Sequence, residues 1–412
     1  MKKKIALLLA IVVILAVLNG FTDKITVFFS QYETEEASAS YTVTEKRTEP
    51  TTRGPAVEIT DIGGPYKLYY QDLTEDEKYL YNDVLSKIYD MPESMLVDKV
   101  SMDQVERVFA ALLYDNPDLI FAGRTNELIT FESEFKFFKQ SSKATVSINY
   151  IMSKSEYAYM KEELDAVCDK IIEGIPSDDE WEIEKYFHDY IIDNCSYYYE
   201  EGDLLCNSAY GALVKGKSAC EGYSKAMKLL LDKVGIRSAV VCGESSARGE
   251  EAGPHMWNAV EIDGKWYYLD VTWDDPVDTE SGKESREYYY FNVDSETLGK
   301  THFNMYKEFD CTSLEEYYFK KTGAYFEYYD RSCEEKIAQL VAESLENGED
   351  SLSVQFATEE AFDTAVADIV ENQRYYNIYL RADKLTDVRF STTSTEWSSY
   401  AERYILVLIP VR

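Results

Sequence analysis

The chain has 412 residues, of which 45% are hydrophobic and 29% charged, and its formal net charge is −34. A chain of this length exceeds one ordinary hydrophobic core, so two or three folded domains are expected. The acidic balance argues against nucleic acid and anionic surfaces as partners, because both require clustered Lys and Arg.

The N-terminus has the layout of an export signal. Three lysines follow Met1 and precede the uncharged apolar run from Ile5 to Leu18. That run is shorter than the roughly 20 residues of a membrane-spanning helix, which leaves two alternatives for residues 1–30, a cleaved signal peptide or an uncleaved membrane anchor. Lysines are retained on the cytoplasmic side. We therefore expect an extracytoplasmic protein that is secreted or anchored to the cell membrane.

Residues 31–57 are rich in Thr, Glu and Ser and contain few large aliphatic side chains. Such a segment cannot bury enough apolar surface to fold, so it is predicted to be a disordered linker. The next region, residues 58–175, is predicted to be a small N-terminal α+β region. Two capping boxes, Thr74-x-x-Glu77 and Ser101-x-x-Gln104, each predict the start of a helix. Strands are predicted at 132–138 and 144–151, and a helix at 156–172.

A further helix is predicted to begin with the capping box Ser177-x-x-Glu180, and it carries His188. A histidine within such a helix is more often a hydrogen-bonded structural residue than part of a reactive site. Residues 325–412 are predicted to form a separate small C-terminal α/β domain without a recognisable motif. Its expected helices cover 333–345 and 359–370, and its expected strands cover 352–356, 375–380 and 405–411.

The seven cysteines are an odd number, so in an exported protein at least one remains outside intramolecular disulfides. Their pairing does not follow from the sequence. No C-x-x-C motif is present, and the three histidines are widely spaced. The spacing of the cysteines and histidines therefore does not fit a zinc site, and we expect no metal and no cofactor. Asp274-Asp275-Pro276 is more typical of a turn than of a calcium site.

Cys220 is predicted to lie in the first turn of a helix. Ser218-x-x-Glu221 fits a capping box, which would make Cys220 the second helical residue. Gly235 occupies a position where a left-handed helix stop is expected. The unpaired N–H groups and positive dipole end of a helix start favour a thiolate, and they could also hold an oxyanion. The alternative is a small buried cysteine that only packs.

A hairpin supplies a candidate base and acid. The runs 255–262 and 265–272 flank Asp263-Gly264, a strong signal for a two-residue turn. In that register Trp257 pairs with Asp270, so His255 lies on the same face as Asp270 and diagonal to it. The carboxylate can then orient the imidazole toward the thiol. A slip of one residue would send Asp270 to the opposite face.

These residues resemble the core of the transglutaminase-like superfamily. The matching segments are Gly211–Val214, Ala219–Ser224, His255–Asn258 and Gly264–Trp273, and a looser likeness extends to His188 and His302. The resemblance implies an α+β, papain-like core over residues 176–320, in which the helix bearing the cysteine packs on an antiparallel sheet bearing the histidine and aspartate. It further implies Cys220 as nucleophile, His255 as base and acid, and Asp270 as the orienting residue.

Members of this superfamily form thioester acyl-enzymes from amides and pass the acyl group to an amine or to water. The resemblance therefore implies an exported thiol enzyme that acts on proteins or peptides as a cysteine protease, an amidase or a protein-glutamine acyltransferase. No side chain could be assigned as the oxyanion donor. The alternative function is a non-catalytic cell-surface binding or scaffold module that retains the fold.

Overall fold

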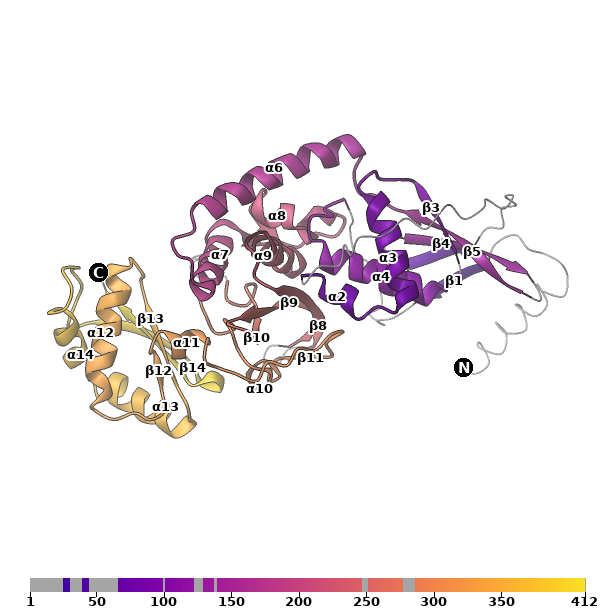
Figure 1. Cartoon of the computed structure of the whole chain (residues 1–412). Helices are drawn as coiled ribbons and strands as arrows, with labels where there is room; N and C mark the ends of the chain where they lie inside the picture. Colours follow the sequence, from indigo (N-terminus) through magenta and orange to yellow (C-terminus); the bar gives the residue numbers. More distant parts are fainter. Residues whose placement is uncertain are drawn as a thin grey trace. The chain divides into compact units, whose positions relative to one another are not determined.

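The computed structural model describes residues 25–29, 39–43, 66–98, 101–121, 129–136, 139–246, 251–276 and 286–411, with the backbone alone described for 25–29, 39–43 and 129–144. The chain forms two compact units (Figure 1). Unit 1 runs to Glu287 and also includes Leu298–Asp310, whereas unit 2 comprises Tyr288–Thr297 and Cys311–Arg412. None of the described helices is long and apolar enough to cross a membrane. The apolar run 5–18 lies outside the described residues.

The described N-terminal backbone contains an antiparallel pair of strands, β1 (Ile25–Phe29) and β2 (Ala39–Val43). Strand β2 falls inside residues 31–57, the segment predicted to be a linker. Tyr41, Thr42 and Val43 are aromatic or β-branched, and such residues favour the extended backbone. The remainder of 31–57 lies outside the described residues.

The next part of unit 1 combines helices with an antiparallel sheet in the order β3-β5-β4. The elements are α2 (Leu68–Gln71), α3 (Glu75–Ile88), β3 (Ser94–Asp98), α4 (Met102–Asp115), β4 (Ile129–Lys136), β5 (Lys139–Ile148) and α6 (Lys154–Glu173). The capping boxes of Thr74 and Ser101 are both confirmed. Helix α6 begins with a third capping box, formed by Ser153 and Glu156.

Helix α7 (Glu180–Asn194) carries His188, but its start differs from the prediction. Its N-cap is Asp179, whose carboxylate accepts the backbone N–H groups of Trp181 and Glu182. The hydroxyl of Ser177 instead accepts the N–H of Asp179. The predicted Ser177 capping box is therefore wrong, because an acidic cap nearer the helix takes the unpaired donors.

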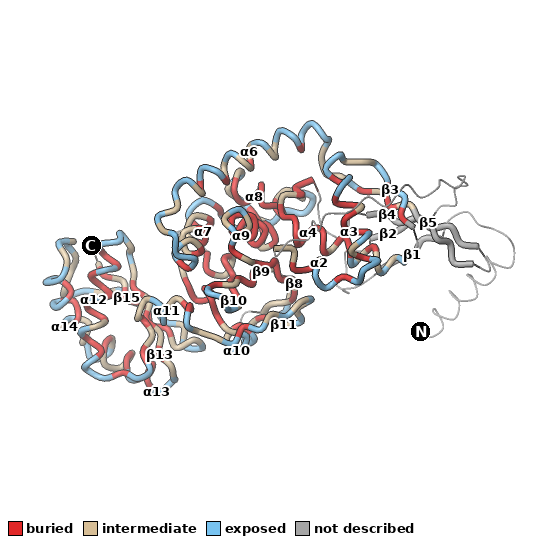
Figure 2. The backbone as a smooth tube through the Cα atoms, viewed as in Figure 1, coloured by how far each residue is buried: buried red, intermediate tan, exposed pale blue. Residues whose placement is uncertain are grey.

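The centre of unit 1 is helix α9 (Cys220–Val234), which packs against β8 (Ser238–Ser245) and β9 (Gly253–Ile262) (Figure 1). The sheet is antiparallel in the order β10-β9-β8-β11, with β10 at Lys265–Leu269 and β11 at His302–Phe303. Figure 2 shows α9 and the strands beneath it as mostly buried. Gly235 ends the helix with φ 86°, as predicted. The mixed α+β class is confirmed.

Short elements lead up to α9, namely β6 (Ser196–Tyr197), η1 (Leu204–Asn207), α8 (Ala209–Leu213) and β7 (Lys217–Ser218). The parallel pair β6–β7 places Tyr197 opposite Ser218, two residues before Cys220. This pairing fixes the path of the chain into the start of α9.

The β9–β10 hairpin has the predicted register, with Lys265 opposite Ile262 and Leu269 opposite Asn258. Asp263 and Gly264 have φ values of 49° and 75°, both left-handed, as a type I′ turn requires. Strand β10 ends at Leu269, so the prediction that it continues to residue 272 is wrong. The Asp270 carboxylate accepts the backbone N–H groups of two following residues and draws the chain into a turn.

Unit 2 has a four-stranded sheet in the order β12-β13-β15-β14, covered by short helices. The strands are β12 (Tyr325–Phe326), β13 (Leu352–Phe356), β14 (Thr395–Tyr400) and β15 (Ile405–Pro410). The helices are α10 (Ser295–Leu298, whose last residue belongs to unit 1), α11 (Tyr318–Lys321), α12 (Cys333–Glu346), α13 (Glu359–Ala365), the π-helix η2 (Val366–Glu371) and α14 (Tyr375–Ala382), with a 3₁₀ turn η3 at Ala401–Arg403.

The strand predicted at 375–380 is wrong, because these residues belong to helix α14. Ile378, Tyr379 and Ala382 are its buried residues, and their spacing follows one face of a helix. The aromatic run itself is compatible with a strand or a helix. Burial against the rest of unit 2 therefore decides the conformation of this segment.

Candidate active site

Cys220 is the first residue of α9 and is half-buried. The N-cap is Ala219, which has no side chain to cap the helix, and the predicted Ser218 capping box is wrong. The Ser218 hydroxyl donates instead to the carbonyl of Cys206 at 2.6 Å, and Glu221 forms an ion pair with Lys225 at 2.8 Å. Cys220 is consequently the first and not the second helical residue. Among the described residues, the cap position supplies no side-chain oxygen to the N–H groups beside the thiol.

The start of α9 is held by backbone contacts with neighbouring segments. The N–H of Ala219 donates to the carbonyl of Cys206 at 2.9 Å, and the N–H of Tyr198 donates to the carbonyl of Ser218 at 2.8 Å. At Gly222 an added Cβ would lie 1.9 Å from the Ser218 hydroxyl and 2.7 Å from a backbone carbonyl. Glycine is therefore required there for the close approach that positions Cys220.

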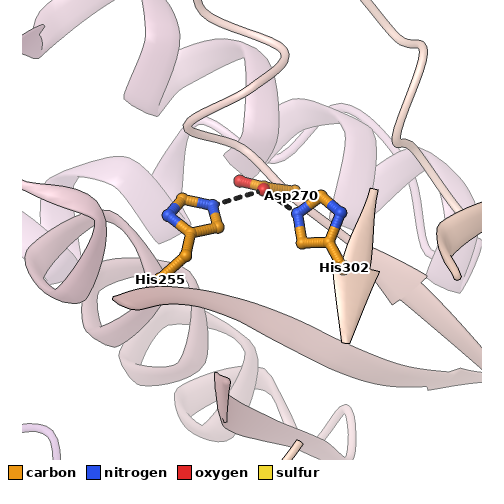
Figure 3. A group of neighbouring side chains, drawn as sticks. All are labelled: His255, Asp270 and His302. Carbon is orange, nitrogen blue, oxygen red and sulfur yellow. Dashed lines mark hydrogen bonds and ion pairs between the residues drawn. The ribbon is translucent and has the colours of Figure 1, made fainter. Parts of the chain in front are cut away.

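The hairpin brings His255 and Asp270 together (Figure 3), with 2.7 Å between the imidazole Nε2 and the carboxylate Oδ2. Both side chains are buried. The structure therefore provides the His–Asp contact that the Asp263-Gly264 register predicts. Because Nε2 is the nitrogen bonded to Asp270, Nδ1 is the one left to serve Cys220.

The charge state of this pair follows from its surroundings. Burial lowers the pKa of His255, but the charge and hydrogen bond of Asp270, together with the hydrogen bond and charge of Cys220, raise it to about 10. Burial raises the pKa of Asp270, but His255 and His302 together hold it well below its usual range. An imidazolium beside an ionised carboxylate is the favoured state at neutral pH.

Asp270 has two further kinds of partner that sequence reasoning missed. Its Oδ1 accepts the backbone N–H groups of Thr272 and Trp273, at 3.0 and 3.1 Å. Its Oδ2, already bonded to His255, lies 2.9 Å from Nε2 of His302. Four donors thus surround one carboxylate, which accounts for its ionised state. No spacing in the sequence links His302 to Asp270, since the contact depends on the pairing of β11 with β8.

The same three side chains could in principle ligate a metal ion. One possible ligand atom from each of His255, Asp270 and His302 lies within 4.8 Å of the others. The distances of 2.7 and 2.9 Å from the two imidazoles to Oδ2 match N–H···O hydrogen bonds. In this structure the three side chains form a hydrogen-bonded cluster.

His188 lies in a different cluster. Its Nδ1 is 3.0 Å from Asp189 and its Nε2 is 3.3 Å from Asp274, with the ring fully buried. Asp275 accepts the hydroxyl of Tyr223 at 2.6 Å. Both carboxylates of the Asp274-Asp275 turn thus bond to side chains of the helices, which agrees with the turn interpretation and with a structural role for His188.

Tyr197 is a second residue near the thiol that the sequence did not reveal. Burial and then the negative charge of Cys220 raise its pKa to about 12. The side chain is 49% exposed, so it lies at the surface beside the start of α9.

Part of the chain is similar to known proteins. Residues 165–271 match the family described as the transglutaminase-like superfamily. The kyphoscoliosis peptidases of Mus musculus and Homo sapiens are each 30% identical over 97 residues, which cover 21% of this chain and 15% of each relative. The chain thus matches only a small part of those relatives. A solved structure of a TGase is 16% identical to this chain, with a TM-score of 0.26. The match covers 39% of this chain and 48% of the TGase chain.

Proposed function

This chain carries a core domain of the transglutaminase-like superfamily, and from that premise we propose a thiol enzyme that acts on amide bonds of proteins or peptides. Cys220 is the nucleophile, His255 is the base and acid, and Asp270 orients the imidazole. The observation that carries the proposal is the buried His255–Asp270 pair beside a cysteine at a helix start. That combination provides a nucleophile, a proton carrier and an orienting group.

The first half of the reaction forms a thioester. The Cys220 thiolate attacks the amide carbonyl carbon, and the electron pair of the C=O bond moves to oxygen. Backbone N–H groups at the start of α9 are the donors available to that oxyanion. The Nδ1 proton of His255 is then transferred to the amide nitrogen as the C–N bond breaks, and the amine leaves.

The second half releases the acyl group. Neutral His255 accepts a proton from water or from an amine, which attacks the thioester carbonyl. Collapse of the tetrahedral intermediate breaks the C–S bond, and the acid or a new amide departs. Water gives peptidase or amidase activity, whereas an amine gives cross-links. The Cys-His-Asp arrangement is compatible with both acceptors.

The test is alkylation of the folded, reduced protein by iodoacetamide over a range of pH, with the modified peptide identified by mass spectrometry. We expect Cys220 to react faster than the same residue in denatured protein, and we expect His255→Ala to slow it by about tenfold or more. If Cys220 reacts no faster than in the denatured control, the enzyme proposal fails and a non-catalytic surface module is favoured.

A glutamine-containing protein incubated with a labelled amine separates the two acceptors. Amine incorporation that depends on Cys220 would identify acyl transfer, whereas ammonia release or peptide cleavage without incorporation would identify hydrolysis. Cys220→Ala is the matched control for both measurements.

We further propose that the enzyme works outside the cytoplasm, secreted or anchored through the apolar run 5–18. The lysines before that run favour this orientation. The net charge of −34 favours a protein or peptide partner over nucleic acid. Fractionation of cells that express the full chain, with protease added to intact cells, tests the location.

A further inference from the structure

His302 is a buried residue of β11 that reaches Asp270 from the side opposite His255 (Figure 3). Its partner on β8 is Ser245. Two indoles pack against the imidazole, with the ring centroids of Trp257 and Trp273 each 4.7 Å from its own and with interplanar angles of 75° and 56°. These edge-to-face and tilted contacts restrain the plane of the ring. Its Nε2 is consequently held at the carboxylate.

The contacts of His302 identify the nitrogen that donates to Asp270. Nε2 lies 2.9 Å from the Asp270 oxygen, and an ionised carboxylate only accepts, so Nε2 carries a proton. Nδ1 lies 2.9 Å from the Thr301 hydroxyl, which donates to the carbonyl of Leu298 at 3.4 Å. His302 therefore donates one hydrogen bond to Asp270 and contacts Thr301 through its other nitrogen.

We propose that His302 is a positioning residue that shares the Asp270 carboxylate with His255 and limits the negative charge acting on the His255 imidazole. The inference rests on the proposed function, in which His255 must both hold and release a proton. Both imidazoles bond to the same oxygen, Oδ2. A second donor withdraws charge from that oxygen and leaves a weaker acceptor for the first.

The other ionisable groups around the pair are few among the described residues. Cys220 of α9 interacts with His255, and Tyr197 of β6 interacts with Cys220 and Asp270. The remaining partners of Asp270 are the backbone N–H groups of Thr272 and Trp273, which do not titrate. These amides hold the carboxylate in place without His302. The loss of His302 therefore changes the charge of the acceptor more than its position.

The test compares wild type with His302→Phe, which keeps a ring beside the two indoles and removes the donor. Two quantities are measured, the titration of the His255 imidazolium by NMR and the pH midpoint of Cys220 alkylation by iodoacetamide. The unshared carboxylate should hold the imidazolium proton more tightly. We expect the imidazolium titration to rise by about one pH unit, and the alkylation midpoint to rise by less, because the added negative charge opposes ionisation of the thiol.

Three further variants complete the experiment. His302→Gln can still donate to Asp270, so it should restore both midpoints toward wild type. Thr301→Val removes the hydroxyl that contacts Nδ1 of His302. It should give a smaller shift in the same direction. His188→Phe removes another buried, carboxylate-bonded histidine of unit 1. It should lower thermal stability and leave both midpoints unchanged.

The outcomes separate this inference from the function on which it rests. If wild-type Cys220 reacts no faster than denatured protein, the proposed function fails. If wild type is fast but the midpoints of His302→Phe are unchanged, or move in the reverse directions, His302 does not limit the charge and the inference is overturned. If His302→Phe does not fold, the smaller shifts of Thr301→Val decide, and unchanged midpoints there overturn the inference as well.

Discussion

Gly222 illustrates how a residue without a side chain determines where the Cys220 thiol lies. It stands two positions after Cys220, where the first turn of α9 meets Ser218 and the carbonyls of Ser208 and Cys206. Both of its closest neighbours are constrained, since Ser218 is bonded to Cys206 and Ser208 contributes its backbone. The helix start cannot approach these groups with any larger residue.

We therefore expect Gly222→Ala to lose about 1–3 kcal/mol of the free energy of unfolding, the usual cost of overpacking, and to slow Cys220 alkylation. Gly253→Ala is the matched control, because a Cβ there meets nothing within 4 Å and φ is not positive. Urea denaturation of both variants measures the difference. Equal stability for the two variants would contradict the packing argument.

The pH dependence of stability follows from His255. Its pKa is raised to about 10 in the folded protein, against about 6.5 for an unperturbed histidine. The folded state thus binds the proton more tightly, so the stabilisation is complete below about pH 6.5 and is lost as pH rises toward 10. Asp270→Asn removes the main partner. The difference in unfolding free energy between wild type and this variant should shrink across that window, and a difference independent of pH would refute the assignment.

At the level of elements, the β9–β10 hairpin sets the distance from His255 to Asp270. Both turn residues, Asp263 and Gly264, have positive φ, which makes the turn match the twist of the strands. Because the side chains of a strand alternate between faces, this two-residue turn keeps Asp270 on the His255 side. The turn lies at the far end of the hairpin from the site, yet it determines which face each residue occupies.

Gly264→Ala should reduce the free energy of unfolding by about 1–2 kcal/mol, because φ of 75° is strained for any residue with a Cβ. No atom of the described residues lies within 4 Å of the added methyl group, so the loss would report the backbone alone. Asp263→Asn is the control, since Asn tolerates the left-handed region and should be nearly neutral. Thermal unfolding of the two proteins is the measurement, and a neutral Gly264→Ala would show that the turn does not hold the register.

Local patterns predicted the elements whose signals are local. The end of α9 at Gly235 and the hairpin register both follow from the sequence, because a helix stop and an Asp-Gly turn are short-range features. The Ser218 capping box failed because the carbonyl of Cys206 competes for that hydroxyl. His302 was missed as a partner of Asp270 because β11 is only two residues long and pairs across the fold. Contacts between distant segments decide such details.

For the whole molecule, the chain passes between its two units more than once. Tyr288–Thr297 belongs to unit 2, Leu298–Asp310 returns to unit 1 with His302, and Cys311 resumes unit 2. The first of these segments is tied to the later part of unit 2 by stacked rings, with Tyr288 and Tyr318 centroids 3.8 Å apart. Unit 2 is therefore built from two pieces of sequence.

A chain ending at Asp310 should consequently fold poorly, although it keeps every residue of the proposed site. Tyr288, Tyr289, Tyr290, Phe291 and Val293 are all buried in the full chain. Without residues 311–412 this apolar cluster loses its partners within unit 2 and becomes a large exposed patch. Light scattering and the soluble fraction measure the effect relative to the full chain. A soluble, monomeric product that unfolds cooperatively would contradict the two-piece assembly.

The interleaving of the two units also limits how this architecture is inherited. A terminal domain joined at one point can be gained, lost or exchanged by a single recombination event. Here a breakpoint before residue 288 would remove β11, which carries His302. A breakpoint after residue 310 would leave the apolar segment 288–297 without the rest of unit 2. Unit 2 and the core that contains the proposed site are therefore expected to be inherited together. Substitutions in one part are then selected in the presence of the other.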